Sequence, residues 1–114
     1  MPKPDDKLFV CISEMRKPEA LMAHMPAHKD WLREQDRHGR VVATGARLPL
    51  GAGGVQIFAA ADRDEMEAIL ASDPLVEHGV AANWIFEFQL NDRPDRGRLM
   101  EHFFGAEFAA GLGS

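Results

Sequence analysis

Alternating apolar and polar residues predict four strands along this chain. The first, residues 8–14, carries apolar side chains on both faces, whereas the last, residues 82–90, places an aromatic residue or leucine at every second position. Between them, β-branched and small residues predict strands over 40–48 and 55–59. The glycine-rich segment 51–54 is typical of a hairpin connection between these two strands.

Two other segments show the spacing of amphipathic helices. Pro26 suits the first position of a helix, where its missing N–H costs nothing, so we predict a helix over 27–37 that ends at Gly39. A second helix is expected to begin after Asp62, whose side chain caps it, and to break at Pro74. The buried positions expected in this helix are Met66, Ile69 and Leu70.

The order β-α-β-β-α-β predicts an α+β fold, a ferredoxin-like sandwich with both helices on one face of an antiparallel sheet. Two helices cover only that face, yet the first strand is apolar on both, so we expect a homodimer that stacks sheet against sheet. We expect residues 1–90 to form this domain. We expect residues 91–114 to form a C-terminal extension whose three phenylalanines dock on the body or on the partner subunit.

Composition narrows the class of protein. The chain has 114 residues, enough for one domain, and 13 Lys and Arg against 18 Asp and Glu give a net charge of −5. No basic cluster is present to neutralise phosphates, so nucleic acid is not an expected partner. No stretch has the pattern of a signal peptide or a membrane span. With a single cysteine, these features predict a soluble cytoplasmic domain.

Two residues stand out as candidates for chemistry. His28 falls in the first turn of the predicted helix, where the helix dipole favours a neutral imidazole. The alternative is a half-buried histidine bonded to backbone. Asp73 extends the buried stripe of the second helix and places a carboxylate at a helix carboxyl end, where the dipole opposes it. The alternative for Asp73 is an Asp-Pro turn.

The topology predicts that these two residues meet. The two helices run antiparallel, so the start of the first lies beside the end of the second, at one edge of the sandwich. The second strand ends at the same edge and brings Gly45 and Arg47 there. A carboxylate beside an imidazole selects the tautomer of the ring and stabilises its protonated form, which is the basis of proton-transfer catalysis.

Short motifs along the chain resemble those of the YCII-related (YciI-like) proteins. The matching segments are Pro-Ala-His at 26–28, His-Gly-Arg at 38–40, Thr-Gly at 44–45, Ala-Ser-Asp-Pro-Leu-Val at 71–76 and Gly-Val at 79–80. The resemblance implies a dimeric α+β barrel and a site centred on a His–Asp pair, with His28 and Asp73 at the matching positions. A characterised relative is a dehydrochlorinase acting on a chlorinated hydroxyhydroquinone. The chain departs from the family at Ala46, where a proline is common, and in its phenylalanine-rich extension.

Other candidates are weaker. His24 and His28 have the spacing of paired zinc ligands on a helix, with His78 or Glu77 as a third ligand. Pro26 between them predicts that the two rings do not share a face, so no metal is expected. Cys11 lies in an apolar strand and is expected to be an inert core thiol. Trp31 and Trp84 are expected to be packing residues; the alternative is that either one forms the wall of a pocket for a flat aromatic ligand.

The sequence therefore favours a small enzyme that needs no cofactor and acts on a small cyclic or aromatic substrate by elimination or isomerisation. His28 would be the general acid or base, and Asp73 would orient it. Gly45 would allow close approach of substrate, and Arg47 would contact it. The alternative is a non-catalytic module on the same fold that binds a small ligand or mediates assembly.

Overall fold

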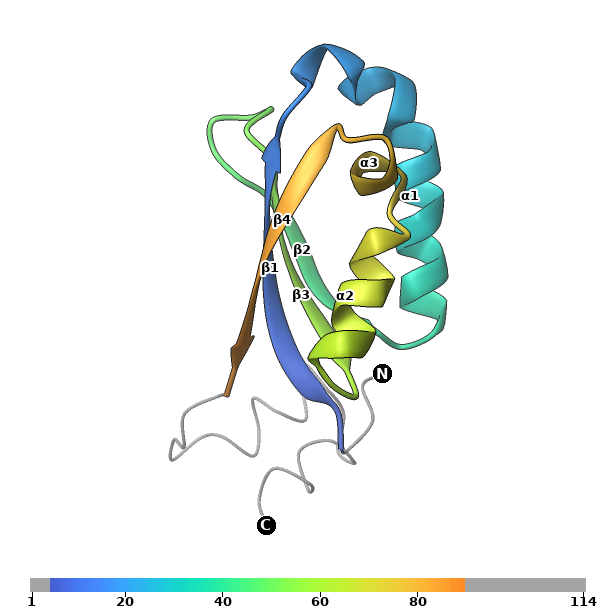
Figure 1. Ribbon diagram of the computed structural model, residues 1–114, viewed down its shortest axis with the longest axis vertical. Coiled ribbons are helices and arrows are strands. Elements are labelled where there is room, and N and C mark those ends of the chain that lie inside the picture. Colours follow the sequence, from blue (N-terminus) through green and yellow to red (C-terminus); the bar gives the residue numbers. More distant parts are fainter. Residues whose placement is uncertain (1–4, 90–114) are drawn as a thin grey trace.

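A computed structural model describes residues 5–89 of the chain. Its elements are, in order, β1 (Lys7–Met15), the 3-10 helix η1 (Pro18–Ala20), α1 (Leu21–Arg37), β2 (Val41–Ala46), β3 (Gly54–Ala60), α2 (Arg63–Ala71), α3 (Pro74–Glu77) and β4 (Ala81–Phe88). Within this part of the chain, the strands form one antiparallel sheet in the order β2-β3-β1-β4. The helices lie together on one side of it (Figure 1). The predicted ferredoxin-like fold is confirmed.

The C-terminal extension predicted for residues 91–114, together with its docking, lies outside the described residues. Within residues 5–89, no helix combines the length and the apolar character needed to cross a bilayer.

Alternation along β1 divides its side chains between the two faces of the sheet. Phe9 and Cys11 turn toward the helices, and Phe9 lies opposite Phe58 of β3. All three are fully buried. The core around them is completed by Trp31, Ala60, Met66, Ile69 and Leu70. The stripe predicted for the second helix therefore packs against the sheet, as its spacing requires.

The signals for helix ends act as predicted at two positions. The side chain of Asp62 accepts a hydrogen bond of 2.8 Å from the backbone N–H of Glu65 and so caps α2. After α1, Gly39 has a φ of 72°, the left-handed conformation that ends helices readily when the residue is glycine.

The start of α1 differs from the prediction. The helix begins at Leu21, and Pro26 lies inside it. Proline removes one hydrogen bond and disfavours helical backbone at the preceding residue. The helix nevertheless runs through it, because Leu21 and Met25 pack against a second apolar cluster. That cluster consists of Leu75, Val80 and Ala81. Burial of the first turns outweighs the local cost of the proline.

The face of the sheet opposite the helices is apolar and bears no helix of the described chain (Figure 1). Its neighbouring pairs on β1 and β4 are Leu8–Phe88, Val10–Phe86 and Ile12–Trp84. Trp84 is 46% exposed and Phe86 54% exposed. Trp84 therefore lies beside Ile12 on this face and outside the core between the sheet and the helices, whereas Leu8 on the same face is buried.

The connection between β2 and β3 lies close against the end of β1. The N–H of Gly54 donates to the hydroxyl oxygen of Ser13 at 2.7 Å, and the guanidinium of Arg47 donates to the carbonyl oxygen of Ser13 at 3.0 Å. Gly53 has a φ of 144°, and a Cβ added there would lie 2.0 Å from that same carbonyl oxygen. Only glycine fits at this position.

We expect Gly53→Ala to lower the free energy of unfolding by about 2 kcal/mol or more, because the methyl group meets backbone and φ is positive. The matched control is Gly45→Ala, where an added Cβ meets nothing within 4 Å. Urea denaturation of both variants measures the difference. Equal stability of the two variants would show that the loop does not approach β1 as described.

Candidate active site

His28 and Asp73 meet between α1 and the junction of α2 with α3. Nδ1 of His28 lies 2.8 Å from Oδ1 of Asp73, although the residues are 45 positions apart in sequence. The two residues are 9% and 4% exposed. A buried carboxylate and imidazole are stable together only when each satisfies the other's hydrogen bonding. The contact between His28 and Asp73 that the topology predicts is therefore observed, and both side chains are shielded from bulk water.

The hydrogen bonds of Asp73 determine the tautomer of His28. An ionised carboxylate only accepts hydrogen bonds, and Oδ1 of Asp73 also accepts the backbone N–H of Leu75 at 3.0 Å. Nδ1 of His28 therefore carries a proton, and this N–H donates a hydrogen bond to Oδ1. In the neutral ring Nε2 is then unprotonated. Among the described residues Nε2 has no hydrogen-bond partner, so it can accept a proton from a bound molecule.

Both local electrostatic predictions need correction. Because α1 begins at Leu21, His28 lies two turns inside the helix, beyond the first turn in which a dipole acts strongly. Asp73 follows the C-cap of α2, but it is also the N-cap of α3 through its bond to Leu75. The capping bond offsets the unfavourable helix end. Asp73 is thus both the starting residue of a turn and the partner of His28.

Trp31 supports the histidine from the next turn of α1. The indole and imidazole rings stack with centroids 5.8 Å apart and planes inclined by 23°. The indole N–H donates to the hydroxyl oxygen of Ser72 at 2.8 Å, and that hydroxyl donates to the carbonyl oxygen of Ile69 at 2.6 Å. Ser72 directly precedes Asp73. This second bond between α1 and the end of α2 therefore holds the two helices at the spacing that the His–Asp contact requires.

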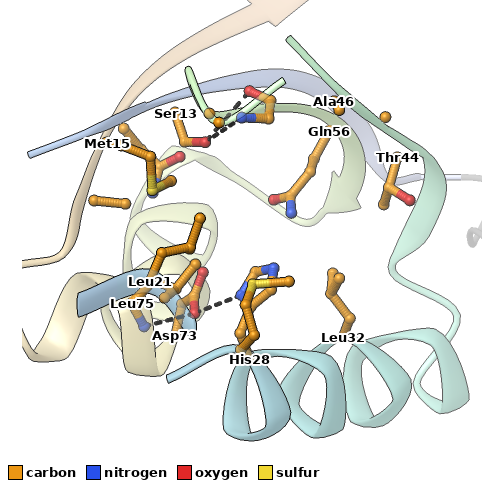
Figure 2. A pocket seen from close by; sticks show the side chains of 17 residues that line it. Ser13, Met15, Leu21, His28, Leu32, Thr44, Ala46, Gln56, Asp73 and Leu75 are labelled. Atoms are coloured by element: carbon orange, nitrogen blue, oxygen red, sulfur yellow. Dashed lines mark hydrogen bonds and ion pairs between the residues drawn. The ribbon is translucent and has the colours of Figure 1, made fainter. Parts of the chain in front are cut away.

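A cavity of about 290 Å³ lies beside the pair, between the sheet and α1 (Figure 2). His28 and Asp73 line it, together with apolar side chains from α1 and α3 and polar ones from the sheet. The apolar group includes Met25, Leu32 and Leu75. The volume is close to the lower end of the range for ligand pockets, about 300–1,000 Å³. A molecule with a single ring fits a space of this size.

The remaining predicted site residues have different positions. Gly45 lines the cavity with its backbone, and its register opposite Val55 directs an added Cβ to the other side of the sheet, where space is open. Arg47 is not among the lining residues. Its guanidinium instead holds the carbonyl of Ser13, which does line the cavity. Arg47 thus contacts the wall of the cavity from outside.

His24 and His28 both lie on α1, one turn apart, so the prediction that Pro26 keeps their rings from sharing a face is wrong. The two residues lie four apart on α1, contrary to the predicted helix start, but the His24 ring stacks on His78 with centroids 4.4 Å apart. Within residues 5–89, no group of three or more His, Cys, Asp or Glu side chains is arranged to hold a metal ion.

Several polar residues of the cavity were not singled out by the sequence. They are Ser13, Thr44, Gln56 and Asn83. Strand alternation would have identified two of them, because Ser13 follows Phe9 and Cys11 on the face toward the helices and Gln56 precedes Phe58 on the same face. A polar residue on the buried face of a strand is the signal that was available.

The fold and this cavity define a class, the ferredoxin-like α+β proteins with a cavity between the sheet and the helices. The chain belongs to the family of the YCII-related domain, whose model matches residues 7–89. The family resemblance drawn from the short motifs is therefore confirmed. No curated protein matches the sequence significantly.

Solved structures share the fold at low sequence identity. One is 5-chloro-2-hydroxyhydroquinone dehydrochlorinase (TftG) from Burkholderia phenoliruptrix AC1100, solved with 2,5-dihydroxybenzoquinone; it is 19% identical, with a TM-score of 0.65 over 74% of this chain and 95% of that chain. Another is SnoaB, a cofactor-independent oxygenase from Streptomyces nogalater, 14% identical, with a TM-score of 0.46 over 79% and 97% of the two chains. At 19% identity the likeness to the dehydrochlorinase establishes the fold.

Cys11 lies in the core, away from this cavity. Burial raises the pKa of its thiol from 9.0 to about 12. The reactive thiolate is therefore negligible at neutral pH, as expected for an inert core thiol.

We expect Cys11 of the native protein to resist a thiol reagent such as DTNB at pH 8 and to react fully in denaturant. Stability should also fall as pH rises above about 9, because the unfolded thiol then ionises while the folded one stays protonated up to about 12. Absorbance of the released thiolate and urea melts at several pH values measure both effects. Rapid labelling of the native protein would contradict the burial of this side chain.

Proposed function

We propose that this protein is a small acid/base enzyme in which Nε2 of His28 removes a proton from a bound substrate. The observation that supports this most directly is the buried 2.8 Å contact between Nδ1 of His28 and Asp73 at the wall of a cavity. The carboxylate orients the ring and stabilises the imidazolium that forms when Nε2 takes the proton. Trp31 keeps the ring plane in place by stacking against it.

Two reactions follow from that proton transfer. In an elimination, the electron pair of the broken C–H or O–H bond moves into the substrate and expels a leaving group such as chloride with its own electron pair. In an isomerisation, the same electron pair takes up a proton at another atom, delivered by the imidazolium. Both reactions balance with His28 as the only proton carrier, so we propose that no cofactor takes part.

The proposed substrate is a small cyclic or aromatic molecule. A cavity of about 290 Å³ with an apolar side formed by α1 and α3 suits a single ring. The structural neighbour named as a dehydrochlorinase was solved with a quinone of that size, 2,5-dihydroxybenzoquinone. Because Gly45 has no side chain, the substrate could lie close to the backbone of β2 at this position. Arg47 would affect substrate binding indirectly, because its guanidinium holds the carbonyl oxygen of Ser13 in the wall of the cavity.

We further propose that a second copy of the chain covers the open face of the sheet. Trp84 and Phe86 would otherwise leave a large part of two aromatic rings in water, beside the apolar side chains of β1. A face that pairs with its own copy gives a closed, two-fold dimer. The rival function, a non-catalytic assembly module, would use this same face. A cytoplasmic location remains part of the proposal.

We expect His28→Ala and Asp73→Asn to fold and to lose turnover by roughly 10²–10⁴-fold, as is typical when a general acid or base is removed. The carboxamide introduced by Asp73→Asn keeps an oxygen that can accept the Leu75 N–H, so α3 stays capped. Chloride release from 5-chloro-2-hydroxyhydroquinone, and absorbance changes of other hydroxylated single-ring compounds, provide the assay.

The matched control is His38→Gln, on an exposed residue at the end of α1 that bonds only to Glu34 among the side chains described. It should retain full activity. Full turnover by both site variants would exclude the mechanism. If wild-type protein turns over no compound, the non-catalytic function is favoured instead: a response of the His28 NMR signals to a compound then indicates ligand binding, and no response indicates the assembly function.

We expect wild-type protein to sediment as a dimer and Phe86→Glu to sediment as a monomer, because the new charge would be buried between two sheets. Met22→Glu is the control, since Met22 is exposed on α1, away from that face. Analytical ultracentrifugation measures the masses. A wild-type monomer would refute the dimer. A dimer that is lost only when residues 92–114 are removed would assign the contact to the extension instead.

A further inference from the structure

The side of the cavity that faces His28 is formed by uncharged polar side chains of the sheet. Gln56 extends from β3 toward His28 across the cavity, with Thr44 of β2 beside it (Figure 2). Asn83 of β4 lines the same space. Neither carboxamide, of Gln56 or of Asn83, has a hydrogen-bond partner among the described residues.

Unpaired carboxamides in a partly enclosed space are costly unless they bind water or a ligand. Both residues are only partly exposed, and both lie on the face of the sheet that turns toward the helices. A hydrophobic residue at position 56 would extend the core formed by its strand neighbour Phe58. The sequence instead keeps a group that can donate and accept hydrogen bonds at once. A carboxamide at this position can bind a hydroxyl or carbonyl oxygen of a ligand.

The charges around the cavity favour an uncharged ligand. Asp73 places a carboxylate in its wall, and among the described lining residues none is Lys or Arg. Arg47 touches the wall at Ser13, but its guanidinium donates to the carbonyl there. A carboxylate or phosphate that entered would lose its hydration beside Asp73, and among the described lining residues it would meet a cation only where His28 is protonated. A neutral phenol or ketone meets no such penalty.

We propose that Gln56, assisted by Asn83, is the residue that determines specificity in this cavity, and that it selects uncharged single-ring compounds bearing hydroxyl or carbonyl oxygens. Gln56 binds such an oxygen on the sheet side while the ring lies against the apolar side chains of α1, with its reacting proton near Nε2 of His28. This inference rests on the proposed function for the orientation of the substrate toward His28. The preference of the cavity for neutral compounds can be measured separately from turnover.

Two single-ring probes test it, resorcinol as the neutral compound and benzoate as the anion. NMR titration of ¹⁵N-labelled full-length protein gives the affinity of each probe and shows whether cavity residues respond. We expect resorcinol to bind at least about tenfold more tightly than benzoate, and Gln56→Leu to weaken resorcinol about five- to tenfold, as for one or two lost neutral hydrogen bonds. Gln89→Leu, the same change on an exposed residue outside the cavity, should bind resorcinol like wild type.

Benzoate binding as tightly as resorcinol, or no binding of either probe, would overturn the inference. So would an unchanged affinity for resorcinol in Gln56→Leu. Parallel titrations of His28→Ala separate this inference from the proposed function. If only the acid/base chemistry is wrong, the preference for the neutral probe persists in the absence of any turnover. If only the specificity assignment is wrong, turnover is lost in His28→Ala but is retained in Gln56→Leu.

Discussion

The buried hydrogen bond between Nδ1 of His28 and Oδ1 of Asp73 joins the parts of the molecule on which any chemistry depends. It connects α1 to the junction of α2 and α3, and it uses an oxygen that also caps α3 through Leu75. The same bond determines which nitrogen of the imidazole carries the proton and which one is available toward the cavity. Removal of the carboxylate would therefore affect the helix junction and the proton chemistry together.

Two neighbouring features hold that bond in place. Trp31 stacks on the imidazole and bonds to Ser72, so α1 is attached to the end of α2 at two successive positions. On the other side of the cavity, the close approach of Gly53 to Ser13 brings the connection between β2 and β3 against β1. The cavity thus lies between two boundaries that are each held by close contacts, and contacts of this kind help to position an acid or base.

The two faces of the sheet differ in their surroundings. On the helix side, apolar residues fill the core at one end, and polar residues such as Gln56 and Asn83 line the cavity at the other. On the opposite side, Trp84 and Phe86 form an apolar surface. Strand alternation allows this division, because neighbouring residues of one strand belong to different environments. One strand, β1, contributes to the core, the cavity and the open face.

Much of this arrangement was predictable from the sequence, because strand alternation and helix capping act over a few residues. The strands, the capped start of α2 at Asp62 and the end of α1 near Gly39 follow from such local signals. The topology then sufficed to predict that His28 and Asp73 meet. The start of α1 was not predictable in this way, because packing of Leu21 and Met25 against distant residues overrides the local effect of Pro26.

The amino-acid sequence by itself determined the order of elements, the apolar stripes and the family, since each depends on residue type and spacing along the chain. Only the tertiary structure decided which side chains share the cavity. Gln56 and Asn83 come from strands far apart in sequence, and Arg47 turns away to the carbonyl of Ser13. Contacts of this kind depend on how strands and helices pack in three dimensions, and short-range patterns of polarity do not encode that packing.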